Sequence, residues 1–417
     1  MRWQFGVVLP AAILASCTSG PVLAGRPSET LSPASRDVEI RIGILVGASS
    51  ASVSGAGQVL LNEPDGSRIA VIPAGESWQV KVAGSGLSVT SPSGWASGQL
   101  DALTLVPTDS RAPLRVNGKA YRGQAEVLRD RTGLTVVNRL GMESYLLGVV
   151  SAEMGRRNST ERAALRAQAV VSRTYALRNL RRWRSQGFDL YATVSDQAYG
   201  GVNAETPEGR AAVSDTWGRV LTYNGDPIEA FYYSTCGGRT ADGFEVFRSA
   251  SRPYLRSAPD VAGNGVAYCS ISPRYHWREE WNGETLRATL GRHLTQLAGG
   301  SERIDGITDV RVTQRSASGR VDQLAIRAGG SELRVDGQSN IRQALRTPAG
   351  DLLRSTAFTI VATRAGNKIT NLVIDGMGAG HGVGLCQWGA VGRARAGQGY
   401  EQILAAYYPG TRLERRY

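Results

Sequence analysis

Histidine and cysteine are scarce in this sequence. It contains three histidines and four cysteines among 417 residues. So few histidines argue against a His-rich metal site and against most mechanisms that need a histidine base. His276 and His293 have ordinary polar neighbours and are expected to be structural, so only His381 lies in an unusual context.

Several functional motifs are also missing. No zinc-finger spacing, basic zipper or aromatic ribonucleoprotein motif accompanies the 48 Lys and Arg residues. The Gly-rich stretch 376–390 lacks the Gly-Lys-Ser/Thr of a phosphate loop. The turn Ser234–Thr240 lacks Gly-x-Ser-x-Gly spacing and a nearby base, which argues against a serine or cysteine hydrolase. The net charge of +12 still predicts a polyanionic partner, with no sign that it is a nucleic acid.

The first residues predict export. Arg2 precedes a short apolar run, and Leu14-Ala15-Ser16-Cys17 resembles a bacterial lipobox. We expect residues 1–16 to be a signal peptide, Cys17 to be lipidated and residues 17–36 to be a flexible tether. Simple secretion with cleavage after Ala24 is the alternative. No later stretch has the length of a transmembrane helix.

The remaining chain predicts an α+β fold with a β-rich body, a helical catalytic segment and a small N-terminal β domain. Alternating apolar and polar residues and many Gly-containing turns place that β domain at 37–109, and residues 110–417 form the second domain. Helices are expected at 142–150, at 161–183 and near 400–408. Strand-like runs lie on both sides of Asn224-Gly225 and at 305–328 and 357–375.

The predicted helix at 161–183 carries two stripes. Small and apolar residues recur from Ala163 to Leu177 at steps of three and four, which favours close packing against a neighbour. The second stripe is polar but uncharged, and it consists of Gln168, Ser172, Tyr175 and Asn179. A solvated face is normally charged. This stripe is therefore either the wall of a site or a half-buried face that bonds to neighbouring loops.

Two further segments contain candidates for chemistry. Glu153 lies among small and apolar residues, where desolvation favours the neutral carboxyl that can donate a proton, although it could also be an exposed cap. His381 lies in a run of glycines followed by Gln387 and Trp388. Trp can stack on a sugar ring while Gln and His bond its hydroxyls, but a tight structural loop would have the same glycines.

An ordered series of motifs resembles the SpoIID/LytB family, which comprises stage II sporulation protein D and amidase-enhancer proteins. The resemblance covers roughly residues 110–417. The motifs are Asn138–Val150, Ala152-Glu153-Met154, Ala164–Ala176, Ser195–Gly201, Ser234–Thr240, Pro253–Ser257, Ser272-Pro273 with Trp277, Gly380–Gly384 and Tyr407–Thr411. The family usually has Pro and apolar residues after Glu-Met, whereas Gly155-Arg156-Arg157-Asn158 follows here.

The resemblance implies a function on peptidoglycan. It assigns the catalytic glutamate to Glu153 and implies lytic transglycosylase action on glycan strands stripped of stem peptides. The alternative is a non-catalytic peptidoglycan-binding protein that activates a cell-wall amidase. Expected partners are glycan strands, possible amidases and the membrane through a lipid anchor, with no nucleic acid. The expected location is the periplasm or cell envelope.

The expected glycan contacts come from the same motifs. We expect His381, Gln387 and Trp388 to line one groove with Glu153. The further candidates are Gln168, Arg173, Tyr175, Gln197, Tyr199 and Ser234.

Three cysteines follow the lipobox. An oxidising compartment favours a disulfide between Cys236 and Cys269, and no cofactor or metal is expected. Because some members of the family hold zinc, zinc at Cys236 and Cys269, with His276 or Cys386 as further ligands, is the alternative. The histidine count and the single cysteine of the Ser234–Thr240 turn favour the disulfide.

Overall fold

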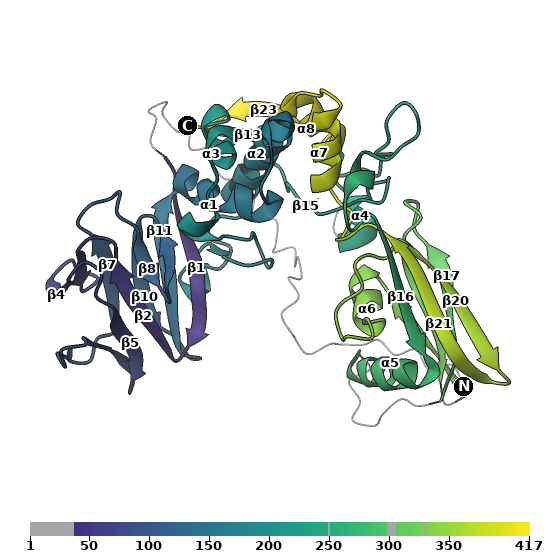
Figure 1. The fold of residues 1–417 in the computed structure, drawn as a ribbon, viewed down its shortest axis with the longest axis horizontal. Helices are drawn as coiled ribbons and strands as arrows, with labels where there is room; N and C mark the ends of the chain where they lie inside the picture. The colour runs from purple at the N-terminus through teal and green to yellow at the C-terminus, as the bar shows by residue number, and fades with distance from the viewer. Residues whose placement is uncertain (1–36, 249–250, 298–305, 329) are drawn as a thin grey trace. The chain divides into compact units, whose positions relative to one another are not determined.

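The computed structural model describes residues 37–248, 251–297, 306–328 and 330–417 (Figure 1). The chain divides into two compact units. The N-terminal unit contains the described residues up to Ala230 together with Arg412–Tyr417, and the C-terminal unit contains Phe231–Thr411. Both units mix helices and antiparallel sheets, so the expected α+β class is confirmed.

The N-terminal unit contains two large sheets. The seven-stranded sheet has the order β12 (Leu190–Tyr191), β1 (Glu39–Ala48), β11 (Leu134–Gly141), β10 (Gln124–Arg129), β7 (Ala102–Pro107), β3 (Val59–Asn62) and β4 (Arg68–Ile72). The five-stranded sheet has the order β6 (Gly86–Thr90), β5 (Trp78–Ala83), β2 (Ser50–Gly55), β8 (Leu114–Val116) and β9 (Lys119–Tyr121). Alternate residues of β2 are buried, as the period of a strand requires.

Strands on both sides of position 109 share these sheets. β1 pairs with β11 from Glu39↔Gly141 to Ala48↔Leu134, and β2 pairs with β8. The small β domain expected at 37–109 therefore shares its hydrogen bonds with residues 114–141. Strand order depends on such long-range pairing, which the local alternation of residues does not encode.

Three helices follow β11 in the same unit. They are α1 (Met142–Met154), α2 (Arg162–Arg178) and α3 (Pro207–Asp215). Nearly every residue of α2 from Ala164 to Ala176 is buried, so this helix lies in the interior of the unit. It ends at Arg178, five residues before the expected Trp183, and the chain then leaves helical geometry, with Arg181 at a positive φ of 66° and its N–H bonded to Asp189. A small sheet of β14 (Asp226–Pro227), β13 (Arg219–Tyr223) and β23 (Arg412–Arg415) completes the unit.

The C-terminal unit contains two three-stranded sheets and a short parallel pair. The sheets are β16 (His276–Asn282), β21 (Lys368–Met377) and β20 (Phe358–Ala365), and β17 (Ile307–Arg315), β18 (Val321–Ala328) and β19 (Ser331–Asp336). The parallel pair is β15 (Tyr232–Tyr233) with β22 (Leu385–Cys386). The helices are α4 (Gly243–Phe247), α5 (Gly283–Leu297), α6 (Gln338–Ala344), α7 (Gln387–Arg395) and α8 (Tyr400–Tyr407).

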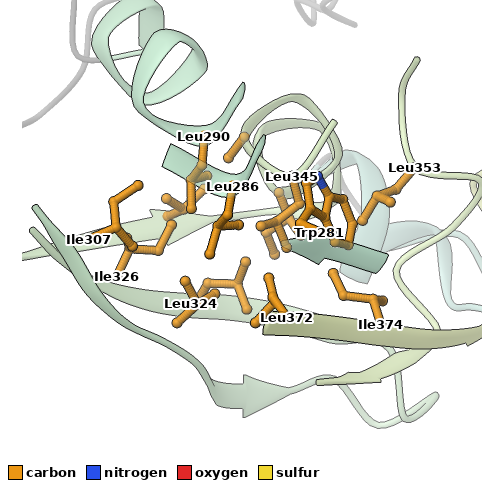
Figure 2. Packing of buried hydrophobic residues seen from close by; sticks show 14 of the residues in the cluster. Trp281, Leu286, Leu290, Ile307, Leu324, Ile326, Leu345, Leu353, Leu372 and Ile374 are labelled. Carbon is orange, nitrogen blue, oxygen red and sulfur yellow. The ribbon is translucent and has the colours of Figure 1, made fainter. Parts of the chain in front are cut away.

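One apolar core holds these two sheets together with α5 and α6. Leu286 and Leu290 of α5 point toward Leu324 of β18 and Leu372 of β21 (Figure 2). Trp281 at the end of β16 is 1% exposed and belongs to the same core. Fully burying one Leu, Ile or Val side chain contributes roughly 1.5–3 kcal/mol, so the apolar side chains of this core together stabilise the unit.

Candidate active site

Glu153 lies in the last turn of α1, and its carboxylate is half-buried. Its Oε1 accepts a hydrogen bond of 2.7 Å from the backbone N–H of Ala198. That donor favours the ionised carboxylate, whereas the negative end of the helix dipole favours the neutral one. Glu153 is thus held at the end of α1 by the backbone of a second segment, residues 195–201.

The segment around Ala198 is fixed by the side chains on either side of it. Gln197 is fully buried, and its Oε1 accepts a hydrogen bond of 3.3 Å from the Tyr145 hydroxyl. Tyr199 is 7% exposed, and its hydroxyl donates to Asn138 Oδ1 at 2.9 Å. Both predicted residues therefore anchor the segment whose N–H group meets Glu153.

The Tyr145 ring connects these groups. Its centroid lies 5.0 Å from that of Tyr199. Burial raises the pKa of Tyr145 well above its usual value, and the nearby Tyr199, Asp196 and Glu153 raise it further. Tyr145 therefore remains a neutral hydroxyl donor over the physiological range.

Asp196, like Tyr145, belongs to this region but was not among the residues predicted from the sequence. Its side chain is fully buried, and its carboxylate accepts hydrogen bonds from the Tyr175 hydroxyl at 2.9 Å and from Trp183 Nε1 at 2.8 Å. Arg182 lies 3.4 Å away as its cation. The motif Ser195–Gly201 contained Asp196, but no sequence period connects it to Tyr175 or Trp183. Tyr175 thus helps to hold the segment that contains Asp196 and Ala198 in place.

The polar stripe of α2 lies inside the N-terminal unit. Gln168 and Ser172 are fully buried, and Gln168 Nε2 donates to Ser172 Oγ at 3.0 Å. Arg173 is also fully buried and forms two hydrogen bonds of 2.6 Å with the Glu143 carboxylate. Its Nη1 donates to the Arg219 carbonyl at 3.0 Å. These contacts make Arg173 a residue that holds α1 against α2, rather than one whose side chain reaches a ligand.

The other predicted residues lie in the C-terminal unit, around β15 and β22. The backbone N–H of Trp388 donates a hydrogen bond to the Ser234 carbonyl at 3.0 Å, and Gln387 is the first residue of α7. His381 Nδ1 accepts a hydrogen bond from the Val383 N–H at 3.1 Å, so Nε2 carries the proton and donates to the Tyr232 carbonyl at 3.0 Å. Ser234, His381, Gln387 and Trp388 are thus brought into one region of this unit.

Burial lowers the pKa of His381 to about 4, opposed by its hydrogen bond to the Tyr232 carbonyl and assisted by the charges of Arg320 and Arg342. The imidazole is therefore neutral near pH 7. The neighbouring glycines serve packing within the protein. At Gly384, which has a φ of 78°, a Cβ atom would lie 2.0 Å from the Phe231 carbonyl oxygen.

Comparison with known proteins shows the family to which this chain belongs. A family model described as stage II sporulation protein (SpoIID) matches residues 130–223, and a domain of unknown function (DUF8618) matches residues 265–384. Stage II sporulation protein D of Bacillus amyloliquefaciens is 30% identical over 296 residues, which cover 67% of this chain and 76% of that protein. The chain belongs to the SpoIID family.

Two other relatives of this SpoIID-family protein differ in how much they share with it. An uncharacterised protein of Brachyspira hyodysenteriae is 31% identical over 300 residues, which cover 71% of this chain and 73% of that protein. The amidase enhancer of Bacillus subtilis is 28% identical over 291 residues, which cover 64% of this chain but only 40% of that protein. The SpoIID match contains β11, α1, α2 and Glu153.

A cluster of cysteines lies in the C-terminal unit of the SpoIID-family protein. The sulfurs of Cys236 and Cys269 lie 3.3 Å apart as separate thiols, and Cys386 and Asp260 join them. The four possible ligand atoms all lie within 4.8 Å of one another. His276, considered from the sequence as a further ligand, is exposed at the start of β16 and is not a member of this group.

The three thiols influence one another. Burial raises the pKa of Cys236 and of Cys386 well above the usual value. Hydrogen bonds from these two thiols and from the N–H groups of Gly237 and Gly238 lower the pKa of Cys269 to about 3.

The predicted leader and Cys17 lie outside the described residues. Within the described residues, no helix is both long and apolar enough to cross a membrane.

Proposed function

We propose that this SpoIID-family protein is an exported lytic transglycosylase that cleaves peptidoglycan glycan strands, with Glu153 as its general acid and base. The observation that carries the proposal is the Glu153 carboxylate, half-buried at the end of α1 and bonded to the Ala198 N–H. The family, with relatives named stage II sporulation protein D and amidase enhancer, supports a function in the cell wall.

The proposed reaction needs one carboxyl group. Glu153 gives its proton to the glycosidic oxygen while the bond to the anomeric carbon breaks and an oxocarbenium-like centre forms. The ionised Glu153 then takes the proton from the C6 hydroxyl of the muramic acid that contains this anomeric carbon. The C6 oxygen bonds to the anomeric carbon and closes the ring. The products are a shortened strand and a 1,6-anhydro end, and no water is consumed.

The surroundings of Glu153 support this scheme over the two-carboxylate mechanism of ordinary glycosidases. Asp196, two residues before Ala198, is buried and bonded to Tyr175, Trp183 and Arg182. It is therefore occupied in holding the segment and is unsuited to act as a nucleophile.

The charge of the chain supports the same class of substrate. A strand without stem peptides still carries a lactyl carboxylate on each muramic acid, and a chain of net charge +12 attracts it. We propose Ser234, Gln387 and Trp388 as glycan contacts, with Trp388 stacking on a sugar ring. His381 is proposed to fix this loop instead, because its two ring nitrogens are bonded to the Val383 N–H and the Tyr232 carbonyl. Gln197 and Tyr199 are proposed to act by fixing the segment beside Glu153.

The test is cleavage of purified denuded glycan strands by wild type and by Glu153→Gln. The substitution keeps the shape of the side chain but removes the transferable proton, so we expect the rate to fall on the order of 100-fold or more. Glu63→Gln is the matched control, because Glu63 is exposed in the β3–β4 turn of the same unit. Mass spectrometry should find 1,6-anhydro ends with wild type and with Glu63→Gln. Equal cleavage by Glu153→Gln would refute the assignment.

The second candidate function is a non-catalytic activator of a cell-wall amidase, which the similarity to the amidase enhancer favours. An activator would release no anhydro ends, but it would increase amidase release of stem peptides from intact peptidoglycan, and Glu153→Gln would retain that increase. Glu153→Gln therefore distinguishes the two functions: a transglycosylase loses its activity with this substitution, whereas an activator keeps its effect on the amidase.

Export to the cell envelope through a lipid anchor at Cys17 is part of the proposal. Mass spectrometry of the mature N-terminus distinguishes a lipidated Cys17 from simple cleavage after Ala24. An unmodified residue 25 at the N-terminus would exclude the anchor.

A further inference from the structure

Four buried side chains with metal-binding atoms meet in the C-terminal unit. Cys236 comes from the end of the β15 segment, Asp260 and Cys269 from the loop before β16, and Cys386 from the start of α7. None of the four is more than 2% exposed. Buried thiols alone are common in protein cores, but a buried carboxylate beside three of them is an unusual set, and these are the atom types that bind metal ions.

The surrounding backbone donates hydrogen bonds to the sulfurs. Cys386 Sγ accepts from the N–H groups of Cys236 at 3.1 Å and of Gly389 at 3.2 Å. Cys236 Sγ accepts from the N–H of Gly238 at 3.3 Å. Such donors stabilise sulfur in its ionised, metal-binding form. The backbone of two separate segments therefore directs N–H donors at these two sulfurs, which would stabilise them as thiolates when a metal is bound.

The fourth member, Asp260, is oriented by neighbours outside the cluster. Its Oδ1 is bonded to the Arg393 guanidinium at distances of 2.9 and 3.0 Å. Its Oδ2 accepts from the Tyr407 hydroxyl at 2.9 Å and lies 3.3 Å from Cys236 Sγ. One oxygen is thus held by Arg393, and the other is directed toward the sulfurs. Ligating carboxylates in metal sites are commonly fixed in this way.

Close approach of α7 to this cluster requires a residue without a side chain. A Cβ atom at Gly389 would lie 2.2 Å from Asp260 Oδ2 and 2.2 Å from the Tyr407 hydroxyl. Gly389 therefore lets the first turn of α7 bring Cys386 against Asp260.

We propose that Cys236, Cys269, Cys386 and Asp260 bind one zinc ion in a closed tetrahedral site. Thiolate-rich sites prefer zinc, and Zn–S bonds of about 2.3 Å require only small movements from the present separations. Zinc displaces the thiol protons, and no oxidant or reductant takes part. With four protein ligands the site has no open position, so its role is to join the β15 segment, the loop before β16 and α7.

A disulfide between Cys236 and Cys269 is the competing arrangement. It would bring the sulfurs from 3.3 Å to about 2.05 Å and would leave Cys386 and Asp260 buried beside an uncharged bond. Zinc engages all four side chains, which is why the geometry favours it.

The first test is the metal content of the full-length chain purified without added chelator. We expect one zinc ion per chain, and its loss in Cys236→Ser, Cys269→Ser and Cys386→Ser. Cys17→Ser is the matched control, and it should retain the metal. A Cys236–Cys269 disulfide-linked peptide in an unreduced digest, in protein that holds no zinc, would overturn the proposal.

The second test does not depend on how the cysteine variants fold. Wild type stripped of metal in reductant is titrated with Co²⁺, and we expect a thiolate-to-cobalt charge-transfer band that saturates at one ion per chain. Tyr407→Phe, which loses the bond to Asp260, should weaken binding about 10- to 100-fold. Tyr408→Phe is its control, because the Tyr408 hydroxyl bonds to the Phe231 carbonyl instead. No charge-transfer band, or equal weakening by both variants, would overturn the proposed site.

Discussion

The ion pair between Arg173 and Glu143 lies in the interior of the N-terminal unit, and Arg173→Met tests its role. The substitution leaves the Glu143 carboxylate, 3% exposed, without its cation. Removing one partner of a buried pair costs about 3–5 kcal/mol. The Tyr417 hydroxyl and the Gly218 N–H still donate to Glu143, which favours the lower end of this range. In a unit of about 200 residues, 1 kcal/mol shifts Tm by about 2–4 °C, so we expect a fall of about 6–20 °C.

Differential scanning calorimetry of the full-length chain measures this fall. Arg166→Met is the matched control on the same helix, because the Arg166 side chain is 32% exposed where it pairs with Asp215, and such a pair contributes about 1 kcal/mol or less. The double variant Arg173→Met with Glu143→Leu should recover part of the loss, since it leaves no unpaired charge. If Arg173→Met unfolds like Arg166→Met but loses glycan binding, Arg173 contacts the ligand and our structural interpretation is refuted.

Two further predictions follow from the site geometry. The pKa of His381 is 6.5 in the unfolded chain and about 4 in the folded protein. Between these two pH values the imidazole binds a proton only when the chain is unfolded. The free energy of unfolding therefore decreases as the pH falls from 6.5 to about 4. We expect a loss of about 3 kcal/mol, visible as a steeper fall of Tm with pH in wild type than in His381→Asn; parallel curves would contradict the neutral imidazole. Asp196→Ala should slow glycan cleavage and lower Tm by releasing the segment beside Glu153, whereas the exposed Ser195→Ala should change neither. Unchanged cleavage by Asp196→Ala would show that this segment does not position Glu153.

In most segments where a local sequence pattern predicted a helix or a strand, the structure has that element. The helices expected at 142–150, 161–183 and 400–408 correspond to α1, α2 and α8. The strands on both sides of Asn224-Gly225 are β13 and β14. α5 was missed, although Leu286, Leu290 and Leu294 recur at steps of four and all enter the core. That period was present in the sequence and could have been found.

The candidate site was predicted unevenly. The family motifs singled out Glu153, but the short helix expected at 142–150 ended before it, and only the structure places it in the last turn of α1. Arg173 and Gln168 occupied the same motifs, yet both are fully buried. Polar residues in a motif serve packing as well as binding, and only their burial and hydrogen-bond partners distinguish the two roles. Asp196 shows the same limit, because its partners come from α2 and from residues 182–191.

The sequence by itself determined the local elements, the scarcity of histidine and the family to which the motifs belong. These properties depend on residue type and spacing along the chain. Tertiary structure alone decided that Asp260 joins three cysteines, that Arg173 pairs with Glu143, and that the Ala198 N–H meets Glu153. Each of these contacts joins residues that are 24 to 150 positions apart. No local period specifies such contacts, because they form only when packing of the apolar core brings distant segments together.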